Sequence, residues 1–298
     1  MKIVIAGGTG FLGSALAGAC RADGHQVAVL TRHPRDAGDV RWAPAAGGFA
    51  LAPALEGADA VVNLAGEGIA DRRWTTSRKE AILRSRTTPT RTIAEAIRAC
   101  KTPPRVFLSA SGVGFYGTRG DEPVTESSGP GDDFLARVCS AWEDEAAQAE
   151  PHARVIFLRT GLVLARDGGA LPRMAMPFRF FAGGPLGSGR HYMPWIHLTD
   201  WVEMVRWAMN NTAVNGPLNL SAPAPVSNAE FTRALGRAMH RPALVPAPAF
   251  ALRMLLGQEM ADSLLLGGQR AIPEKAQQLG YRFRFTEIDA ALGNVFAR

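Results

Sequence analysis

The stretch that decides the fold is Met1-Lys2-Ile3-Val4-Ile5-Ala6-Gly7-Gly8-Thr9-Gly10-Phe11-Leu12-Gly13, at the start of the chain. Its first half is an apolar run rich in β-branched residues, which predicts a buried strand, and the Ala/Leu pattern that follows predicts a helix. Gly7 permits a sharp turn off the strand, Gly10 leaves room for a pyrophosphate, and Gly13 lets the helix pack close to the sheet. The helix N-terminus adds N–H donors and a positive dipole end. The stretch therefore predicts a dinucleotide-binding site.

The residues after the next predicted strand, Gln26–Leu30, indicate which dinucleotide binds. A site that prefers NAD carries Asp or Glu there, to accept hydrogen bonds from the ribose 2′-hydroxyl. This chain has Thr31-Arg32 instead, followed by His33 and Arg35. A guanidinium can clamp a 2′-phosphate through two hydrogen bonds, so we expect NADP(H) as cofactor. The alternative is a solvated arginine at a strand end.

Length and composition are those of an ordinary soluble globular protein of 298 residues, 47% hydrophobic and 20% charged. No apolar run reaches the roughly 18 residues of a membrane span. The N-terminus lacks signal-peptide organisation. We therefore expect a cytoplasmic location and no membrane partner. Cys20, Cys100 and Cys139 lie far apart without metal-ligand spacing, which predicts reduced thiols and no metal site.

The formal charge of +6 and pI near 9.7 raise the question of nucleic acid. Cations concentrate in one segment: Arg72, Arg73, Arg78, Lys79, Arg84, Arg86 and Arg91. Only Trp74 interleaves among them as an aromatic, and no nucleic-acid motif is present, so we expect no nucleic-acid partner. Two interpretations stay open for the segment. It is a solvated helix face, or a subset of it lines a site for an anionic cofactor or substrate.

The first half of the chain alternates short apolar runs with amphipathic helical segments. The expected elements are a strand within Asp59–Gly66, a helix over Ser77–Cys100, a strand over Arg105–Ala110, a helix over Asp132–Glu150 and a strand over Arg154–Arg159. Repeated βα units predict an α/β fold, a doubly wound parallel sheet of the Rossmann type.

The second half is richer in Gly, Pro, Met and aromatic residues. We expect a short strand over Trp195–Leu198, then a helix over Trp201–Asn210 capped by Thr199-Asp200. Leu218–Ser221 could return to the main sheet, and Ser227–Arg298 is expected to be mainly helical. The predicted division is an NADP-binding Rossmann domain over 1–166, rejoined by 198–221, and a smaller, mostly helical substrate-capping domain over 167–197 and 222–298.

Several motifs together resemble one family. They are Gly7–Gly13, Asn63–Gly66, Ser109–Gly112, Arg159–Gly161, Gly183–Gly189, Pro194–His197 and Gly280–Phe283. Their order and spacing are similar to the extended short-chain dehydrogenases/reductases, in the atypical epimerase-like branch (sugar-nucleotide-epimerase-like proteins, some labelled "cell-division inhibitor"). The resemblance covers essentially the whole chain. It implies cofactor contacts from Gly7, Thr9, Gly10, Phe11, Leu12, Gly13, Thr31, Arg32, Leu64, Ala65, Gly66, Arg86, Ser109 and Leu162.

The chain departs from this family at its catalytic residues. Members use a Tyr and a Lys, four residues apart on the helix after the Ser-bearing strand, and the Tyr transfers the substrate proton. Here the Tyr position holds Phe134 or Leu135, and the Lys position holds Val138 or Cys139. Phe cannot transfer a proton, and Val can neither anchor a ribose nor lower a pKa. The usual proton relay is therefore absent.

Three residues remain as catalytic candidates. Ser111 matches the family's Ser and could hydrogen-bond a carbonyl, and Tyr116 could supply a proton or merely close the site as a loop aromatic. Arg86 stands at the family's helix Asn position and could bind a cofactor phosphate or a substrate carboxylate. We interpret Cys139 as a buried apolar group. His191 and His197 are interpreted as structural or substrate-lining.

The sequence therefore predicts an NADP-binding, epimerase-like oxidoreductase acting on an unidentified small anionic molecule, as a monomer or homodimer. The alternative is a non-catalytic NADP-binding regulatory or sensor protein, which the missing Tyr and Lys favour.

Overall fold

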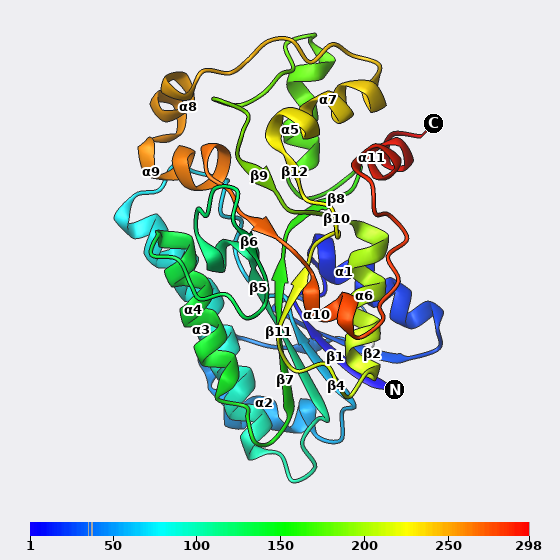
Figure 1. Cartoon of the computed structure of the whole chain (residues 1–298). Coiled ribbons are helices and arrows are strands. Elements are labelled where there is room, and N and C mark those ends of the chain that lie inside the picture. The colour runs from blue at the N-terminus through cyan, green and yellow to red at the C-terminus, as the bar shows by residue number, and fades with distance from the viewer. Residues whose placement is uncertain (35, 37, 298) are drawn as a thin grey trace.

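A computed structural model describes residues 1–34, 36 and 38–297, and its centre is a seven-stranded parallel sheet (Figure 1). From one edge to the other the strands are β3 (Val40–Arg41), β2 (Gln26–Thr31), β1 (Lys2–Ala6), β4 (Ala60–Asn63), β5 (Val106–Gly112), β7 (Arg154–Thr160) and β11 (Gly216–Leu220). The strand order reverses between β1 and β4. Open α/β sheets bind their ligands beyond the carboxyl ends of the strands at such a point.

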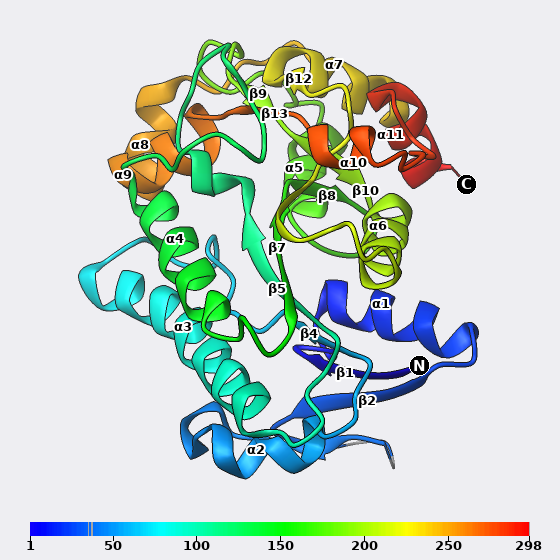
Figure 2. The same cartoon turned by 60° about the horizontal axis from the view of Figure 1, so that its bottom comes forward.

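Helices cover both faces of the sheet, because successive side chains of each strand point to opposite sides. Ile3 and Ile5 pack with α1 (Phe11–Ala22) and α6 (Leu198–Asn210). Val4 and Ala6 share the other core with α2 (Gly48–Leu55), α3 (Thr76–Ala99) and α4 (Phe134–Ala147). Figure 2 shows α1 and α6 on one side of the strands and α2, α3 and α4 on the other.

Most of the remaining elements gather above the carboxyl ends of the strands, whereas the helix Glu274–Gln278 lies beside β11 and the turn Pro44–Ala46 lies against α3 (Figure 1). Three short strand pairs lie above the sheet: β8 (Leu162–Leu164) with β10 (Trp195–His197), β9 (Tyr192–Met193) with β12 (Val226–Ser227), and β6 (Pro123–Val124) with β13 (Arg270–Ala271). The helices are α5 (Leu171–Arg179), α7 (Asn228–Met239), α8 (Ala249–Leu256), α9 (Gln258–Ala261), α10 (Glu274–Gln278) and α11 (Ile288–Phe296). Short helical turns are η1 (Pro44–Ala46), η2 (Val113–Tyr116) and η3 (Asp262–Leu266). A separate core of α5, α7 and α11 side chains supports this part.

The start of α6 differs from the sequence prediction. The helix begins at Leu198 rather than Trp201, and His197 caps it, because its Nδ1 accepts the Thr199 N–H at 3.1 Å. Asp200 cannot serve as the cap. Its two carboxylate oxygens accept the backbone N–H groups of Arg284 and Phe285 at 2.7 and 2.9 Å. The predicted cap at Thr199-Asp200 is therefore wrong.

Within the described part of the chain, no helix is long and apolar enough to cross a membrane. Nor do the described residues bring three His, Cys, Asp or Glu side chains together where they could hold a metal ion.

Candidate cofactor and active site

The glycine loop between β1 and α1 has the shape that a pyrophosphate requires. Gly7 has a φ of 75°, and a Cβ there would lie 2.7 Å from the Leu64 carbonyl carbon. A Cβ at Gly13 would overlap the Gly7 carbonyl oxygen. At Gly10, by contrast, a Cβ would meet only the Gly7 oxygen, in a tight contact of 3.3 Å, so this position is far less crowded than Gly7 and Gly13. Among the described residues no side chain caps α1, and its first turn carries no acid, so its N–H groups are available to an anion.

The segment after β4 lies against the glycine loop. Asn63 fixes it, because its Oδ1 accepts the Ala65 N–H at 3.1 Å while its Nδ2 donates to Thr90 Oγ1 at 2.7 Å. A Cβ at Gly66 would lie 3.3 Å from the Arg86 side chain, so Leu64-Ala65-Gly66 and Arg86 are brought together as predicted from the sequence. They lie beside the glycine loop.

Arg86 is held in place by backbone carbonyls. Its Nη2 donates to the Glu67 oxygen at 2.9 Å and its Nη1 to the Ile82 oxygen at 3.1 Å. The guanidinium lies 5.1 Å from the centre of the Trp142 ring. Burial lowers the pKa of Arg86, but a guanidinium remains charged in proteins. The result is a fixed positive charge at the floor of the predicted cofactor site.

The residues predicted to choose the cofactor lie at the end of β2. Thr31 Oγ1 accepts the His33 N–H at 3.2 Å, which turns the chain after the strand. Arg32 is exposed, and no hydrogen bond or ion pair engages it within the described residues. Its side chain is thus available to a phosphate. Arg35, also noted in the sequence, lies outside the described residues.

The loop after β8 covers the start of α1. A Cβ at Gly168 would overlap the Phe11 ring, and Phe11 and Leu12 both pack against the main core. Leu162 opens β8 and is half-buried, whereas Thr9 is exposed at the tip of the glycine loop.

Ser109 lies on β5 and is 1% exposed. Its hydroxyl has no hydrogen-bond partner among the described residues. An unpaired buried hydroxyl carries a desolvation penalty that a bound polar group would relieve. Ser109 therefore fits its predicted place near the cofactor.

At the end of β5, Ser111 belongs to a buried polar network. Its Oγ donates to Glu143 Oε1 at 2.6 Å. Arg159 binds the same carboxylate through two hydrogen bonds of 2.8 Å, from Nε and Nη2. The side chains of Arg159 and Glu143 are only 3% and 8% exposed, so this ion pair is sealed from solvent. Glu143 comes from α4 and Arg159 from β7, and neither was singled out as a site residue in the sequence.

Tyr116 extends the network away from Ser111. Its hydroxyl accepts from Arg159 Nη1 at 3.0 Å and donates to Asn219 Oδ1 at 2.7 Å. The residue is fully buried, and burial raises the pKa of Tyr116 to about 12. The guanidinium of Arg159 also lies 3.5 Å from the centre of the Phe115 ring. Tyr116 is therefore built into the core beneath the site, which suits a positioning role better than proton transfer to a substrate.

The structure separates the two pairs of α4 residues that the sequence offers for the family's Tyr and Lys positions. Leu135 and Cys139 face η2 and the end of β5, within reach of Gly114 and Gly112. Phe134 and Val138 instead face α3 and pack with Ile82. Burial raises the pKa of Cys139 to about 11, so its thiol stays protonated at neutral pH. An apolar side chain and a neutral thiol thus replace the Tyr and Lys.

A cation that sequence reasoning missed lies on β13. Arg270 Nε is buried and has no hydrogen-bond partner in the described chain. The guanidinium lies 5.4 Å from the centre of the Tyr192 ring. Its neighbour Ala271 belongs to the same buried cluster as Tyr116 and Cys139, which places β13 above the end of β5. No motif marks Arg270, and only the strand pairing brings it to this region.

Cations of the segment before and within α3 contact residues that are distant in the sequence. Arg73 Nε donates to the Leu255 oxygen at 2.6 Å, at the end of α8, and Lys79 pairs with Glu259 of α9 at 2.8 Å. Of the seven cations in the segment, Arg72 alone has neither a hydrogen bond nor an ion pair among the described residues. Most cations of this segment are therefore engaged in contacts within the chain.

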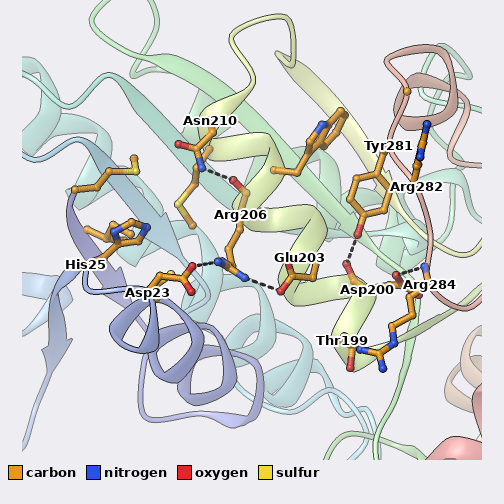
Figure 3. A pocket seen from close by; sticks show the side chains of 16 residues that line it. Asp23, His25, Thr199, Asp200, Glu203, Arg206, Asn210, Tyr281, Arg282 and Arg284 are labelled. Atoms are coloured by element: carbon orange, nitrogen blue, oxygen red, sulfur yellow. Dashed lines mark hydrogen bonds and ion pairs between the residues drawn. The ribbon is translucent and has the colours of Figure 1, made fainter.

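A separate hollow of about 640 Å³ runs along α6 beside α1 (Figure 3). Three of its charged side chains form one group, in which Arg206 lies between Asp23 and Glu203. Met1 and His25, at the amino-terminal ends of β1 and β2, also line it. None of the site residues predicted from the sequence lines this hollow, so it is distinct from the candidate site.

The sheet order and the glycine loop define a dinucleotide-binding protein of the Rossmann class. The chain belongs to the NAD dependent epimerase/dehydratase family, whose pattern it matches over residues 3–221. Residues 247–295 match a domain of unknown function, DUF1731. The predicted fold class and family resemblance are thereby confirmed.

Relatives along the whole chain support the same assignment. An epimerase family protein of Mycobacterium leprae is 43% identical over 298 residues, covering 99% of this chain and 96% of its own. The human epimerase family protein SDR39U1 is 37% identical over 300 residues, with all of both chains covered. A crystal structure of human SDR39U1 (isoform 2) with NADPH superimposes with a TM-score of 0.92 at 36% identity, covering 99% of each chain.

Proposed function

We propose that this protein is an NADPH-dependent oxidoreductase or epimerase that acts on a small anionic molecule at the carboxyl ends of the strands. The cofactor assignment rests on the less crowded position at Gly10, the unengaged Arg32 and the NADPH in the human relative's crystal. When bound, this cofactor donates or accepts a hydride. The rest of the chemistry must come from the chain's own side chains.

The observation that carries the proposal is the Ser111–Glu143–Arg159 network. The proton of the Ser111 hydroxyl is engaged by Glu143, so the oxygen presents its lone pairs to a substrate. A substrate hydroxyl that is being oxidised suits this arrangement. Its proton passes to Ser111 Oγ while the Ser111 proton passes to the Glu143 carboxylate at Oε1. Reduction of a carbonyl runs the same path in reverse and starts from Glu143 that has first taken up a proton. This relay takes the place of the missing Tyr and Lys.

The other members of the network act through Ser111. Arg159 fixes the Glu143 carboxylate with two hydrogen bonds, and Tyr116 and the Phe115 ring fix Arg159 in turn. We therefore assign Tyr116 as a positioning residue rather than as the proton donor considered from the sequence. Ser111 remains the residue that touches the substrate.

Arg270 supports an anionic substrate. A guanidinium with a buried, unpaired N–H gains a charge-assisted hydrogen bond when a carboxylate or phosphate arrives. Arg86 also carries a positive charge, but its donors already bind the Glu67 and Ile82 carbonyls, and it lies beside the glycine loop. We assign the substrate's anion to Arg270 and the cofactor side to Arg86.

A non-catalytic NADPH-binding sensor is the second candidate. The apolar Leu135 and the protonated Cys139 at the family's catalytic positions favour it. Such a protein would bind NADPH and release it unchanged.

The test is single-turnover oxidation of bound NADPH with a panel of small carbonyl compounds, half of them bearing a carboxylate or phosphate. We expect oxidation with anionic compounds only, a rate reduced by about 10²–10⁴ in Ser111→Ala, and a raised KM in Arg270→Met. Arg84→Met is the matched control, because Arg84 is exposed and pairs only with Glu80 on its own helix. Equal rates in Ser111→Ala and the intact protein would contradict the proposed proton relay through Ser111.

A further inference from the structure

Exposed apolar side chains concentrate in two segments of the part above the sheet. Among the described residues, eight of the eleven large apolar side chains that are exposed lie in two segments of the sequence. We call these eight side chains the apolar face: Met176, Phe180, Phe181, Leu244, Val245, Phe250, Met254 and Leu255. Leu244 is 81% exposed and Met254 is 74% exposed. Concentrations of this kind mark binding surfaces.

The two segments lie side by side. Val245 N–H donates to the Gly183 oxygen at 3.0 Å, and Gly187 N–H donates to the Ala247 oxygen at 2.9 Å. The chain then enters α8 directly, and no residue of this helix is buried. In Figure 1 these segments cross the outer side of the molecule, away from the central sheet, and lead to α8.

Cations predominate in the two segments themselves, and acids that reach them from elsewhere, Asp262 and Asp289, are paired with Arg253 and Arg237. No Asp or Glu occurs from Gly168 to Thr199 or from Phe231 to Gln258. Next to Leu244 lies a hollow of about 590 Å³, lined by Arg233, Arg237, His240 and Arg241. Arg237 is paired with Asp289, whereas Arg241 lies 4.7 Å from the centre of the Phe181 ring and makes no ion pair among the described residues.

The charges around the apolar face indicate what kind of partner binds to it. A second copy of the chain would bring Arg233 and Arg241, which make no ion pair among the described residues, close to the same two cations, so self-association through this face is disfavoured. A partner helix needs an apolar groove to receive its side chains. Here the apolar groups project and the hollow beside them is cationic. Projecting Phe, Leu and Met with adjacent arginines match a lipid interface, where apolar groups enter the acyl region and cations meet phosphates.

We propose that the apolar face binds the surface of an anionic phospholipid bilayer. The inference goes beyond the proposed function and does not depend on it. It also departs from the sequence prediction of no membrane partner, which concerned spanning segments and signal peptides. The phospholipid headgroup enters the hollow lined by Arg233 and Arg241, while Phe250, Met254 and Leu244 enter the acyl boundary.

The test is cosedimentation of the full chain with vesicles of phosphatidylcholine alone and of phosphatidylcholine mixed with phosphatidylglycerol. We expect binding to the mixed vesicles only, weakened by added salt. The double variant Phe250→Ser/Met254→Ser should bind at least about tenfold more weakly. Arg233→Glu/Arg241→Glu should lose about fivefold or more for each cation. Phe49→Ser is the matched control, because Phe49 is 89% exposed on α2, outside the apolar face.

NADPH affinity measured on the same variants reports whether the fold is intact. The proposal is overturned if the intact protein stays in the supernatant with mixed vesicles. It is also overturned if the Phe250/Met254 variant binds as the intact protein does. A dimer of the intact protein in solution that this variant abolishes would identify a second copy as the occupant instead.

Discussion

Replacing Arg159 by Met should destabilise the fold severely, because it leaves the buried Glu143 carboxylate without its cationic partner. The change removes two hydrogen bonds of 2.8 Å to Glu143, one of 3.0 Å to Tyr116 and the stacking on Phe115. Removing one partner of a buried ion pair costs about 3–5 kcal/mol. Since about 1 kcal/mol shifts the Tm of a large domain by about 2–4 °C, the Tm should fall by about 6–20 °C.

The assay is urea and thermal unfolding of Arg159→Met, Glu143→Gln and the double variant. The double variant should lose less than the sum of the single variants, because neither charge is left without its partner. Arg91→Met is the control. Arg91 also pairs with a glutamate of α4, Glu145, but its side chain is 58% exposed, so its loss should cost at most about 1 kcal/mol. Equal losses of stability in Arg159→Met and Arg91→Met would refute the claim that losing a partner of the buried ion pair costs more than losing a partner of the exposed one.

Three further predictions follow from the site and its surroundings. NADPH should bind about 10²-fold more tightly than NADH, and calorimetry should show that Arg32→Ala abolishes this preference while NADH binding persists. Gly10→Val should lose nucleotide binding yet keep the circular dichroism of the intact protein, since only the Gly7 oxygen lies near a Cβ there. Burial lowers the pKa of His197, so the stability it contributes is present above about pH 6.5 and is lost as pH falls through the lower folded pKa. Protonation of Nδ1 also removes the cap on Thr199, so His197→Asn should flatten the loss of Tm between neutral and acidic pH; unchanged pH dependence would count against this assignment.

Local patterns in the sequence were sufficient to predict the elements that form the candidate cofactor site. The strand–glycine–helix stretch and the helix expected over Ser77–Cys100, observed over Thr76–Ala99, follow from periodicity and turn chemistry within short windows. The strand expected at Leu218–Ser221 is observed as Gly216–Leu220 and pairs with β7. The domain boundaries at 166 and 222 stay predictions.

The polar network at the active site could not be predicted in the same way. Arg159 belongs to one of the motifs that carry the resemblance, but nothing in the sequence pairs it with Glu143. The two residues meet because α4 packs beside β5 and β7. Arg270 reaches the region through the pairing of β13 with β6, nearly 150 positions earlier in the chain. The cap of α6 was mispredicted for a similar reason, because Arg284 and Phe285 engage Asp200 from a distant segment.

The measurement that tests the proposed function most directly is transfer of deuterium from NADPH labelled at C4 of the nicotinamide. The protein is incubated with the labelled cofactor and a mixture of small carboxylated and phosphorylated carbonyl compounds, and the products are analysed by mass spectrometry. We predict deuterium in an anionic product with the intact protein, none with Gly10→Val, and transfer about 10²–10⁴ times slower with Ser111→Ala. Tight binding of NADPH by the intact protein with all deuterium still on the cofactor would contradict the proposed function and identify a sensor.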